Sequence, residues 1–463
     1  MKKGNTMKKT SIILLAMTLL LTSFISCSRR NNYEDQLEEQ TTHAFENPLD
    51  EQYDTPTIHK GGSTPYYADK SVEDLEALFL NSSRNSQTIN LQMYPTGTLF
   101  TNIVDTSGES QMYFYNKLTG NISAWCADPL CTHELEKCVW SAAEICYVGT
   151  EEIVFKSAFE GGDHKLYICD LQRNNVREIY DIADYYEPDE YGQGGDGYSD
   201  MVHVEYLYDD LVYVFYTAYS ESGSGVEAIY TIDLNNLEFK KRFEIPNTIG
   251  LQAWIEDSVI YRDSTQKGKL FRADLNFENS EVIAEGDSLA GYTDRYLVVN
   301  ELEEGEFYPQ ASYVYDLQTE QTYDLPDVSF STAIISGDYI YYKRNLTEEE
   351  MENDPMKDYY TWKWEYKKKP MSAQTQGAGK IYRVKIGENT EECVLQLTYK
   401  DVPVRIESIA VDGEVVFFTY KHYEQFKNYL NQDFPDSSNE PLHYAVADLQ
   451  NGTVKVLDFA NAE

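Results

Sequence analysis

The chain has 463 residues and carries 78 acidic against 38 basic side chains, which gives a formal net charge of −40 at pH 7. Such a charge excludes binding to nucleic acid or to an anionic lipid surface through general electrostatic attraction. The 39 tyrosines, set in segments that alternate apolar and polar residues, are typical of an all-β protein with half-buried aromatic side chains.

Residues 1–26 have the layout of a secretory signal, with a basic start and an apolar run over 12–25 that is too short to span a membrane comfortably. The sequence Phe24-Ile25-Ser26-Cys27 resembles the lipobox of bacterial lipoproteins, in which the cysteine is diacylated and becomes the mature N-terminus. This resemblance implies lipidation of Cys27 and a location on the extracytoplasmic face of the cell membrane. An ordinary secretory signal with a chance cysteine is the alternative.

Residues 27–68 are polar and acidic and contain few large apolar side chains, so they are predicted to form a disordered tether. Residues 69–89 are predicted to hold a short helix and a lead-in to the next domain. Ser71 and Asp74 have the spacing of a capping box, and Leu75, Leu78 and Phe79 share one helical face, which predicts a helix that ends near Leu80.

From residue 90 to residue 463 one strand pattern recurs seven times. Its copies end in Asp-Leu or a relative of it, and they include Lys269–Leu275, Ala228–Leu234 and His443–Leu449. Around each copy the sequence predicts four strands, a to d, joined by turns. Four-stranded sheets of this size bury their faces by packing around an axis. We therefore predict a seven-bladed β-propeller of four-stranded antiparallel blades, with six or eight blades as alternatives.

The copies resemble the repeats of YWTD-type and TolB-type propellers, most closely at Leu270–Leu275. The sixth copy departs from the pattern, because Lys385 stands where the others have Asp. If strands a to d alternate in direction, the a–b and c–d turns lie on one face and the b–c and d–a loops on the other. The long insertions over 126–140, 181–200, 345–379 and 421–441 all fall in the second set, which predicts a binding face there.

Three cysteines and a histidine cluster in the loop between the first two predicted blades. Cys126, Cys131, His133 and Cys138 have donor atoms that suit a tetrahedral zinc site with no open position. Disulfides among these cysteines and Cys146 are the alternative for an exported chain. The run Cys-x-Asp-Pro-x-Cys-x-His resembles one in uncharacterised lipid-anchored bacterial propeller proteins, and that resemblance implies a surface lipoprotein without assigning an activity.

An aromatic row lies in the insertion over 345–379. Tyr360, Trp362, Trp364 and Tyr366 alternate with polar and charged residues, which predicts that they share one face of an extended segment. Such a row could stack on sugar rings or a peptide, or it could cover apolar surface of the domain itself.

Acidic residues occur in two further patterns. Six carboxylates between residues 184 and 200 could surround Ca²⁺, although a solvated loop explains them as well. The aspartates that close the repeated strand, namely Asp170, Asp233, Asp274, Asp316 and Asp448, are predicted to accept N–H groups of the turn that follows.

The sequence contains no nucleophile elbow, zinc-protease motif or phosphate-binding glycine loop. Our first hypothesis is therefore a monomeric, non-enzymatic binding or scaffold module for a protein, peptide or glycan, with no cofactor other than a structural zinc ion. A propeller enzyme of glycosidase or lyase type, with acidic residues in its axial funnel, is the second hypothesis. A structural or assembly role is the third.

Overall fold

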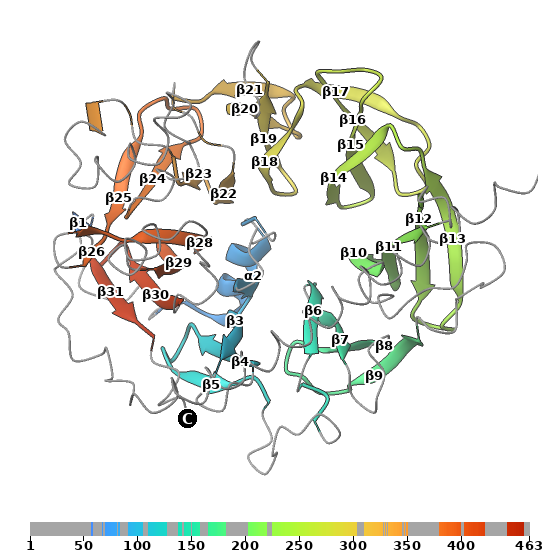
Figure 1. Ribbon diagram of the computed structural model, residues 1–463, viewed down its shortest axis with the longest axis horizontal. Coiled ribbons are helices and arrows are strands. Elements are labelled where there is room, and N and C mark those ends of the chain that lie inside the picture. Colours follow the sequence, from blue (N-terminus) through green and yellow to red (C-terminus); the bar gives the residue numbers. More distant parts are fainter. Residues whose placement is uncertain are drawn as a thin grey trace, which may run out of the picture. The chain divides into compact units, whose positions relative to one another are not determined.

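Figure 1 shows the computed structural model of the protein, in which β-sheets are arranged as blades around a central axis. The described residues all belong to one unit, residues 53–463. No helix among them is both long and apolar enough to cross a membrane. The structure describes residues 57–58, 67, 70–80, 82–83, 91–104, 110–126, 138–140, 143–149, 151–157, 165–181, 202–219, 225–302, 310–326, 328, 330, 332–344, 347, 349–350, 379–399, 402–421 and 442–457.

The predicted seven-bladed propeller is confirmed, and each blade is built from consecutive antiparallel strands. Blade 1 contains β2 (Leu91–Tyr94), β3 (Gly97–Val104), β4 (Ser110–Asn116) and β5 (Ile122–Ala124). Blade 2 contains β6 (Ala143–Val148), β7 (Glu152–Ser157), β8 (Lys165–Asp170) and β9 (Arg177–Asp181). Blade 3 contains β10 (Val202–Tyr208), β11 (Leu211–Tyr219), β12 (Gly225–Asp233) and β13 (Phe239–Ile245).

The remaining blades follow the same order. Blade 4 contains β14 (Ile249–Ile255), β15 (Ser258–Asp263), β16 (Lys269–Asp274) and β17 (Glu281–Glu285). Blade 5 contains β18 (Ser288–Tyr292), β19 (Tyr296–Glu301), β20 (Gln310–Asp316) and β21 (Gln321–Asp324). Blade 6 contains β22 (Ala333–Ser336), β23 (Tyr339–Tyr342), β24 (Lys380–Lys385) and β25 (Glu392–Gln396), and blade 7 contains β28 (Arg405–Asp412), β29 (Val415–Lys421), β30 (His443–Asp448) and β31 (Thr453–Val456). The short strands β26 (Thr398–Tyr399) and β27 (Val402–Pro403) form a hairpin between these two blades.

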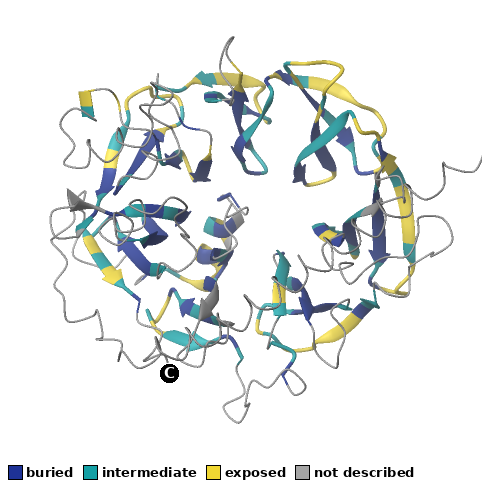
Figure 2. Ribbon diagram, viewed as in Figure 1, coloured by how far each residue is buried: buried dark blue, intermediate teal, exposed yellow. Residues whose placement is uncertain are grey.

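The hydrophobic core lies between the blades. In β19, Leu297 and Val299 pack with residues of blade 4, whereas Val298 packs with residues of blade 6. A strand that is buried on both faces needs apolar side chains at successive positions, which explains the continuous apolar runs in the inner strands. Figure 2 shows this distribution, with burial concentrated in the inner strands and exposure in the outer ones.

The antiparallel order gives the propeller two different faces. The a–b and c–d turns are short and lie on one face, which we call the turn face. The strand ends from which the b–c and d–a connections leave lie on the opposite face, which we call the loop face. The insertions over 126–140, 181–200, 345–379 and 421–441 leave from these ends, although most of their residues lie outside the described part of the chain.

The predicted short helix is confirmed as α2 (Val72–Leu80). The Ser71 backbone N–H and hydroxyl donate to the Asp74 carboxylate, and the Asp74 N–H donates to the Ser71 hydroxyl at 3.1 Å, as a capping box requires. Leu75 and Phe79 are buried in the core cluster that also contains residues of blades 7 and 1.

The segment around α2 binds the turn face of neighbouring blades. Before the helix, the Tyr67 hydroxyl donates to the Asp412 carboxylate in blade 7. After the helix, Ser82 and Ser83 bond to Ser336 and Ile335 in blade 6. Because Ser336 and Asp412 end the inner strands at the a–b turns, the segment lies over the inner ends of these blades on the turn face (Figure 1).

Two described parts of the predicted 27–68 tether contact the propeller. Thr57–Ile58 form β1, which pairs antiparallel with β25 and adds a fifth strand at the outer edge of blade 6. Tyr67 is buried against blade 7. The described residues of this predicted tether therefore include some that pack on the propeller.

A buried ion pair joins blade 7 to blade 1, where the two ends of the ring meet. The Lys117 ammonium contacts the Asp412 carboxylate, and the two side chains are 0% and 1% exposed. Lys117 also donates to the Tyr94 carbonyl at 2.9 Å, and the Tyr67 hydroxyl bonds to Asp412. Since each terminal blade supplies all four of its own strands, side-chain contacts close the ring here.

The structural role predicted for the repeated aspartates is confirmed. Asp274 accepts the backbone N–H of Glu278 at 2.8 Å and the amide of Asn279 at 2.8 Å, and these bonds hold the pKa of its carboxyl below the ordinary value. The same turn bonds occur at Asp170, Asp233, Asp316 and Asp448.

Candidate functional site

Ionisable side chains gather on the two innermost strands of several blades, between the middle of the strands and the loop face. We call six of them, on blades 2, 3, 6 and 7, the axial polar ring; His203, Arg262 and Glu301 hold comparable positions in β10, β15 and β19. Three of its members are acidic and three are basic, and none is among the repeated turn aspartates. The ring consists of Glu144, Lys156, Glu205, Lys343, Arg405 and Glu407.

β-Bulges place two of the acidic members. The pairing of β10 with β11 shifts register between Val204 and Tyr206, so Glu205 is the extra residue of β10. Glu407 is likewise the extra residue between Ile406 and Ser408 in β28. A bulge turns successive side chains away from strict alternation and is a common device for aiming a side chain next to a functional site.

Glu205 is half-buried and accepts a hydrogen bond from the indole Nε1 of Trp254 at 3.1 Å. Burial raises the pKa of this carboxyl above its ordinary value, and the bond from Trp254 opposes that shift. A carboxyl in such a setting can hold a proton at a pH at which ordinary glutamates have lost theirs, so it can donate that proton as an acid.

A cationic group with the opposite shift lies between blades 6 and 7. Lys343 follows β23, and its ammonium donates to the backbone carbonyls of Glu407 at 2.6 Å and of Ile406 at 3.2 Å. Burial lowers the pKa of Lys343 to about 8. Beside it, Arg405 and Glu407 form an ion pair of 2.9 Å whose side chains are 32% and 27% exposed.

A second charged pair lies on blade 2. The Lys156 ammonium is 3.9 Å from the Glu144 carboxylate, and the Glu144 side chain is 73% exposed. The axial polar ring therefore offers exposed charge of both signs together with two groups, Glu205 and Lys343, whose pKa values burial moves toward neutrality from opposite sides.

The sequence did not reveal this ring. Only the second hypothesis, a propeller enzyme, placed acidic residues in an axial funnel. Its signal is polar residues within the apolar inner strands, such as Glu205 in Val202–Tyr208. That signal is weak, because the direction of the Glu205 side chain depends on a bulge that the sequence does not predict.

The structure brings together two of the four predicted metal ligands. The Sγ atoms of Cys126 and Cys138 lie 3.7 Å apart, whereas Cys131 and His133 lie outside the described residues. Among the described residues, no group of three or more His, Cys, Asp or Glu side chains is arranged to hold a metal ion.

The other predicted sites cannot be placed. The lipidation site Cys27 and the aromatic row of Tyr360, Trp362, Trp364 and Tyr366 lie outside the described residues, as do the carboxylates between residues 184 and 200.

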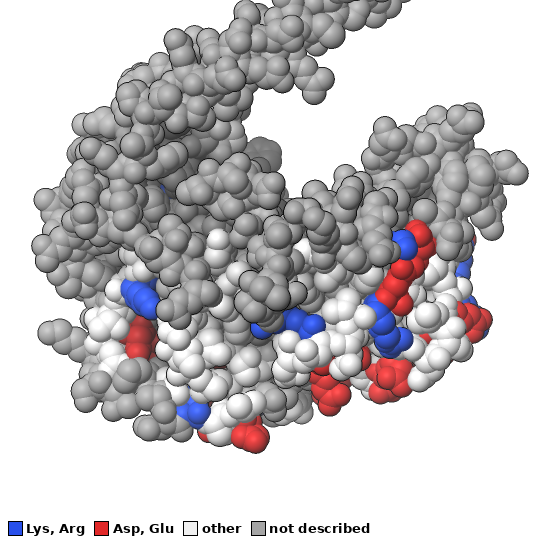
Figure 3. Space-filling view, turned by 90° about the horizontal axis from the view of Figure 1, so that it is seen from below, with Lys and Arg blue, Asp and Glu red and all other residues white. Residues whose placement is uncertain are grey.

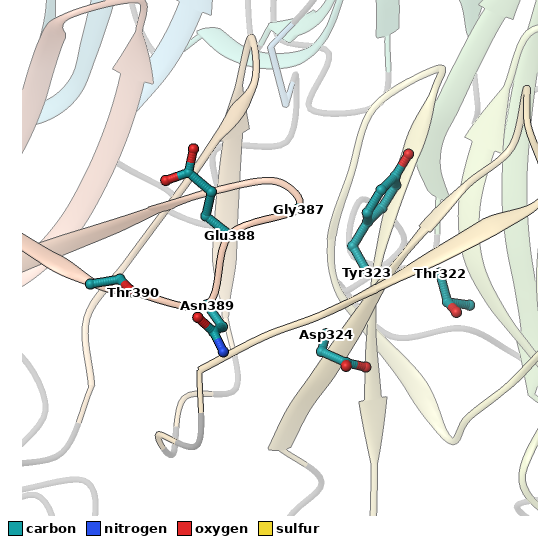
Figure 4. A pocket seen from close by; sticks show the side chains of 7 residues that line it. All are labelled: Thr322, Tyr323, Asp324, Gly387, Glu388, Asn389 and Thr390. Carbon is teal, nitrogen blue, oxygen red and sulfur yellow. The ribbon is translucent and has the colours of Figure 1, made fainter.

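An open cleft of about 570 Å³ lies between the outer parts of blades 5 and 6. Figure 4 shows Thr322, Tyr323 and Asp324 of β21 on one side and the turn 387–390 on the other. Glu388 in this turn pairs with the exposed Lys385 at 3.1 Å. The cleft is a groove between outer strands. None of the residues that line it belongs to the axial polar ring.

On one side of the rim, the described residues form no patch of a single charge. Figure 3 views the ring edge-on, and the described residues on that side carry acidic and basic side chains interspersed with one another.

Comparison with known proteins revises one expectation. No protein-family model and no curated protein sequence matches the chain. Solved structures similar to it include the propeller domain of the trilobed protease from Pyrococcus furiosus, with 12% identity, coverage of 81% of this chain and 98% of that one, and a TM-score of 0.45. Oligogalacturonate lyase from Vibrio parahaemolyticus has 10% identity, coverage of 80% and 94%, and a TM-score of 0.42. The polysaccharide lyase Uly1 has 9% identity, coverage of 88% and 98%, and a TM-score of 0.38.

These likenesses contradict the prediction that the chain is not an enzyme, because propellers of this kind include a protease domain and two lyases. The absence of a familiar catalytic motif does not by itself exclude an enzyme, because the same chemistry recurs on unrelated folds. At identities of 12% or less the likeness shows the fold alone and assigns no reaction.

Proposed function

We propose that the protein is a lipid-anchored, extracytoplasmic propeller that binds a polymer, either a glycan or a peptide, at the axial end of its loop face. The observation that supports this proposal is the difference between the two ends of the axis. On the turn face, the segment around α2 lies over the inner ends of blades 6 and 7. Toward the loop face, the inner strands carry the axial polar ring.

The chemistry of the ring suits a polar ligand. Its exposed carboxylates and cations can form hydrogen bonds with hydroxyl, amide or carboxyl groups, and its members lie on or next to the inner strands of blades 2, 3, 6 and 7. A ligand that contacts members on several blades has to present several polar groups, as a glycan or a peptide does.

One observation favours catalysis at the same site. Glu205 lies in a bulge of the inner strand β10, and burial raises the pKa of its carboxyl, which suits a general acid. The second candidate function is therefore acid–base cleavage of the bound polymer, of glycosidase or lyase type, with Glu205 as the proton donor.

Glycan and peptide arrays probed with the labelled mature chain test the binding proposal. For the ligand that binds, we expect Glu205→Gln to weaken binding by about tenfold, as for the loss of a hydrogen bond to a charged group. Glu281→Gln, which changes an exposed glutamate on the outer strand β17, is the matched control and should leave binding unchanged. Equal binding by both variants, or the lack of any bound ligand, would contradict the proposal.

Incubation of the wild-type protein with the bound polymer tests the catalytic candidate. We expect new reducing ends or unsaturated products, and Glu205→Gln should lower the rate by a factor of about 10² to 10⁴, as for the loss of a general acid. The rate should also fall as the pH rises through the pKa of Glu205. A rate that is unaffected by the substitution would show that Glu205 is not the acid.

The anchor is tested separately by metabolic labelling with a fatty acid. Wild-type protein should incorporate the label and sediment with membranes, and Cys27→Ala should lose both properties. An unlabelled wild-type protein would instead support the ordinary secretory signal.

A further inference from the structure

The connection between blades 1 and 2 brings two cysteines into contact. Cys126 comes two residues after the end of β5, and Cys138 comes five residues before β6. The Cys138 thiol donates a hydrogen bond to the Cys126 sulfur, with 3.7 Å between the two Sγ atoms. A disulfide requires about 2.05 Å between sulfur atoms, so modest rotations of the two side chains bring the pair to bonding distance.

Packing on both blades holds the pair together. Trp125, the residue before the first cysteine, is 2% exposed and meets Trp140 edge to face with ring centroids 5.7 Å apart. Trp140 in turn stacks on Phe155 of blade 2 at 4.5 Å. The Ser157 hydroxyl of blade 2 donates to the carbonyl of Val139, the residue after the second cysteine, at 2.6 Å. Residues next to both cysteines therefore fix the place where the two sulfur atoms meet.

The two sulfur atoms differ in access and in charge environment. Cys126 is half-buried, whereas Cys138 is 3% exposed. The Arg173 guanidinium donates to the Trp125 carbonyl, and burial lowers the pKa of Arg173 while Cys126 is the first of the groups that oppose this shift. A neighbouring cation and an S–H donor both favour the thiolate, which is the nucleophilic form of cysteine. Cys126 is therefore suited to attack an incoming reactant, and Cys138 is suited to attack second, from within the fold.

Two other cysteines, both on blade 2, have a different environment. Burial raises the pKa of Cys146 and of Cys169 to about 12, so both stay protonated near neutral pH. The Cys146 thiol donates to the Glu144 carbonyl at 3.5 Å. Thiol–disulfide exchange begins with attack by a thiolate that the reactant can reach, so these environments favour Cys126 over the other two.

We propose that Cys126 and Cys138 are a disulfide-forming pair, which is oxidised by exchange with a small-molecule disulfide. The Cys126 thiolate attacks one sulfur of that disulfide, forms a mixed disulfide and releases one thiolate. The Cys138 thiol then gives up its proton and attacks the Cys126 sulfur, which forms the Cys126–Cys138 bond and releases the second thiolate. The two cysteines lose two electrons and two protons, and the small-molecule disulfide gains both and becomes two thiols.

The bond closes the chain from residue 126 to residue 138 into a loop. Such a link restricts the unfolded chain and so stabilises the folded one. It also joins the end of blade 1 covalently to the start of blade 2. This chemistry does not depend on the proposed polymer site, whose failure would leave it intact.

Differential alkylation of the full mature chain, equilibrated with mixtures of reduced and oxidised glutathione, tests the proposal. After acid quenching and denaturation, free thiols are blocked with N-ethylmaleimide, and disulfides are then reduced and labelled with iodoacetamide. As the oxidised fraction rises, Cys126 and Cys138 should move together to the second label, and a non-reduced digest should contain their linked peptide. Cys169 should keep the first label. Retention of the first label by Cys126 and Cys138, or a bond from either to a different cysteine, would overturn the proposal.

Two variants test the order of the steps. Cys138→Ser should accumulate a glutathione adduct on Cys126, because the second attack is blocked. Cys126→Ser should form an adduct on the buried Cys138 about tenfold more slowly. Cys393→Ser, which changes an exposed cysteine on blade 6, is the matched control and should form the Cys126–Cys138 bond as the wild type does. Equal rates of adduct formation at the two cysteines would contradict their assigned roles, and the wild-type labelling decides the proposal even if a variant fails to fold.

Discussion

Buried ionisable residues in this propeller have two kinds of environment. Lys117 and Asp412 are buried together, so the charge of each is met by the other. Glu205 instead meets the neutral indole N–H of Trp254, and burial raises the pKa of its carboxyl. Groups of the first kind hold blades together, whereas groups of the second kind are candidates for chemistry. The local sequence does not show which environment a buried ionisable residue has, because the residue that it contacts comes from another blade.

The Lys117–Asp412 pair allows a test of stability at the closure of the ring. We expect Lys117→Met to lower the free energy of unfolding by about 3–5 kcal/mol, because Asp412 would remain buried without its cation. Lys165→Met, which breaks the more exposed pair of 2.8 Å with Glu178, is the matched control and should cost less than about 1 kcal/mol. Urea denaturation of both variants measures the difference. Equal effects would show that the buried pair does not stabilise the closure.

His443 allows a test of pH dependence. Burial lowers the pKa of its imidazole to about 4, against about 6.5 in an unfolded chain, and its ring stacks on Tyr420. Between pH 4 and pH 6.5 the unfolded state therefore binds a proton that the folded state does not. The free energy of unfolding should fall as the pH drops through this range, by up to about 3 kcal/mol.

Denaturation of the wild type and of His443→Phe at a series of pH values isolates this contribution. The phenyl ring keeps the stacking but cannot titrate, so the difference in stability between the two proteins should change across that window and be constant above pH 7. A constant difference at every pH would mean that the imidazole titrates normally in the folded state.

At the scale of single elements, features that depend on residues close in the sequence were predicted correctly. The capping box of α2 depends on Ser71 and Asp74, which lie three residues apart, and the turn bonds of Asp274 reach residues at most five positions away. The exposure of a strand residue was harder to predict, because it depends on segments that are distant in the sequence. Cys393 lies in the strand β25 and is nevertheless exposed, on the strand that pairs with β1.

Helix α2 provides a test of how the N-terminal segment contributes to the fold. Leu75 is fully buried in a cluster with residues of blades 7 and 1, so Leu75→Ala should lower the free energy of unfolding by about 2–5 kcal/mol. Val72, at the start of the same helix, is 43% exposed, and Val72→Ala should change stability by less than about 0.5 kcal/mol. Chemical denaturation compares the two, and a small effect of Leu75→Ala would show that the helix does not stabilise the propeller.

At the scale of the whole molecule, the repeats predicted the number of blades and the separation of turns from loops. Periodicity carries this information because each blade repeats the same four strands. The closure of the ring was not predicted, since Tyr67, Lys117 and Asp412 are up to 345 residues apart and their contacts are not part of the repeated pattern. The axial polar ring was missed for the same reason, because its members come from different blades.

The central claim is that the two ends of the axis differ, with the turn face covered over its inner blade ends by the N-terminal segment and the loop face presenting ionisable groups. Carbodiimide-driven labelling of carboxylates in the mature chain, read by mass spectrometry, tests it most directly. We predict that Glu144 and Glu407, whose side chains are 73% and 27% exposed, react, and that Asp412, at 1%, is protected. Protection of the two glutamates together with rapid labelling of Asp412 would contradict the account.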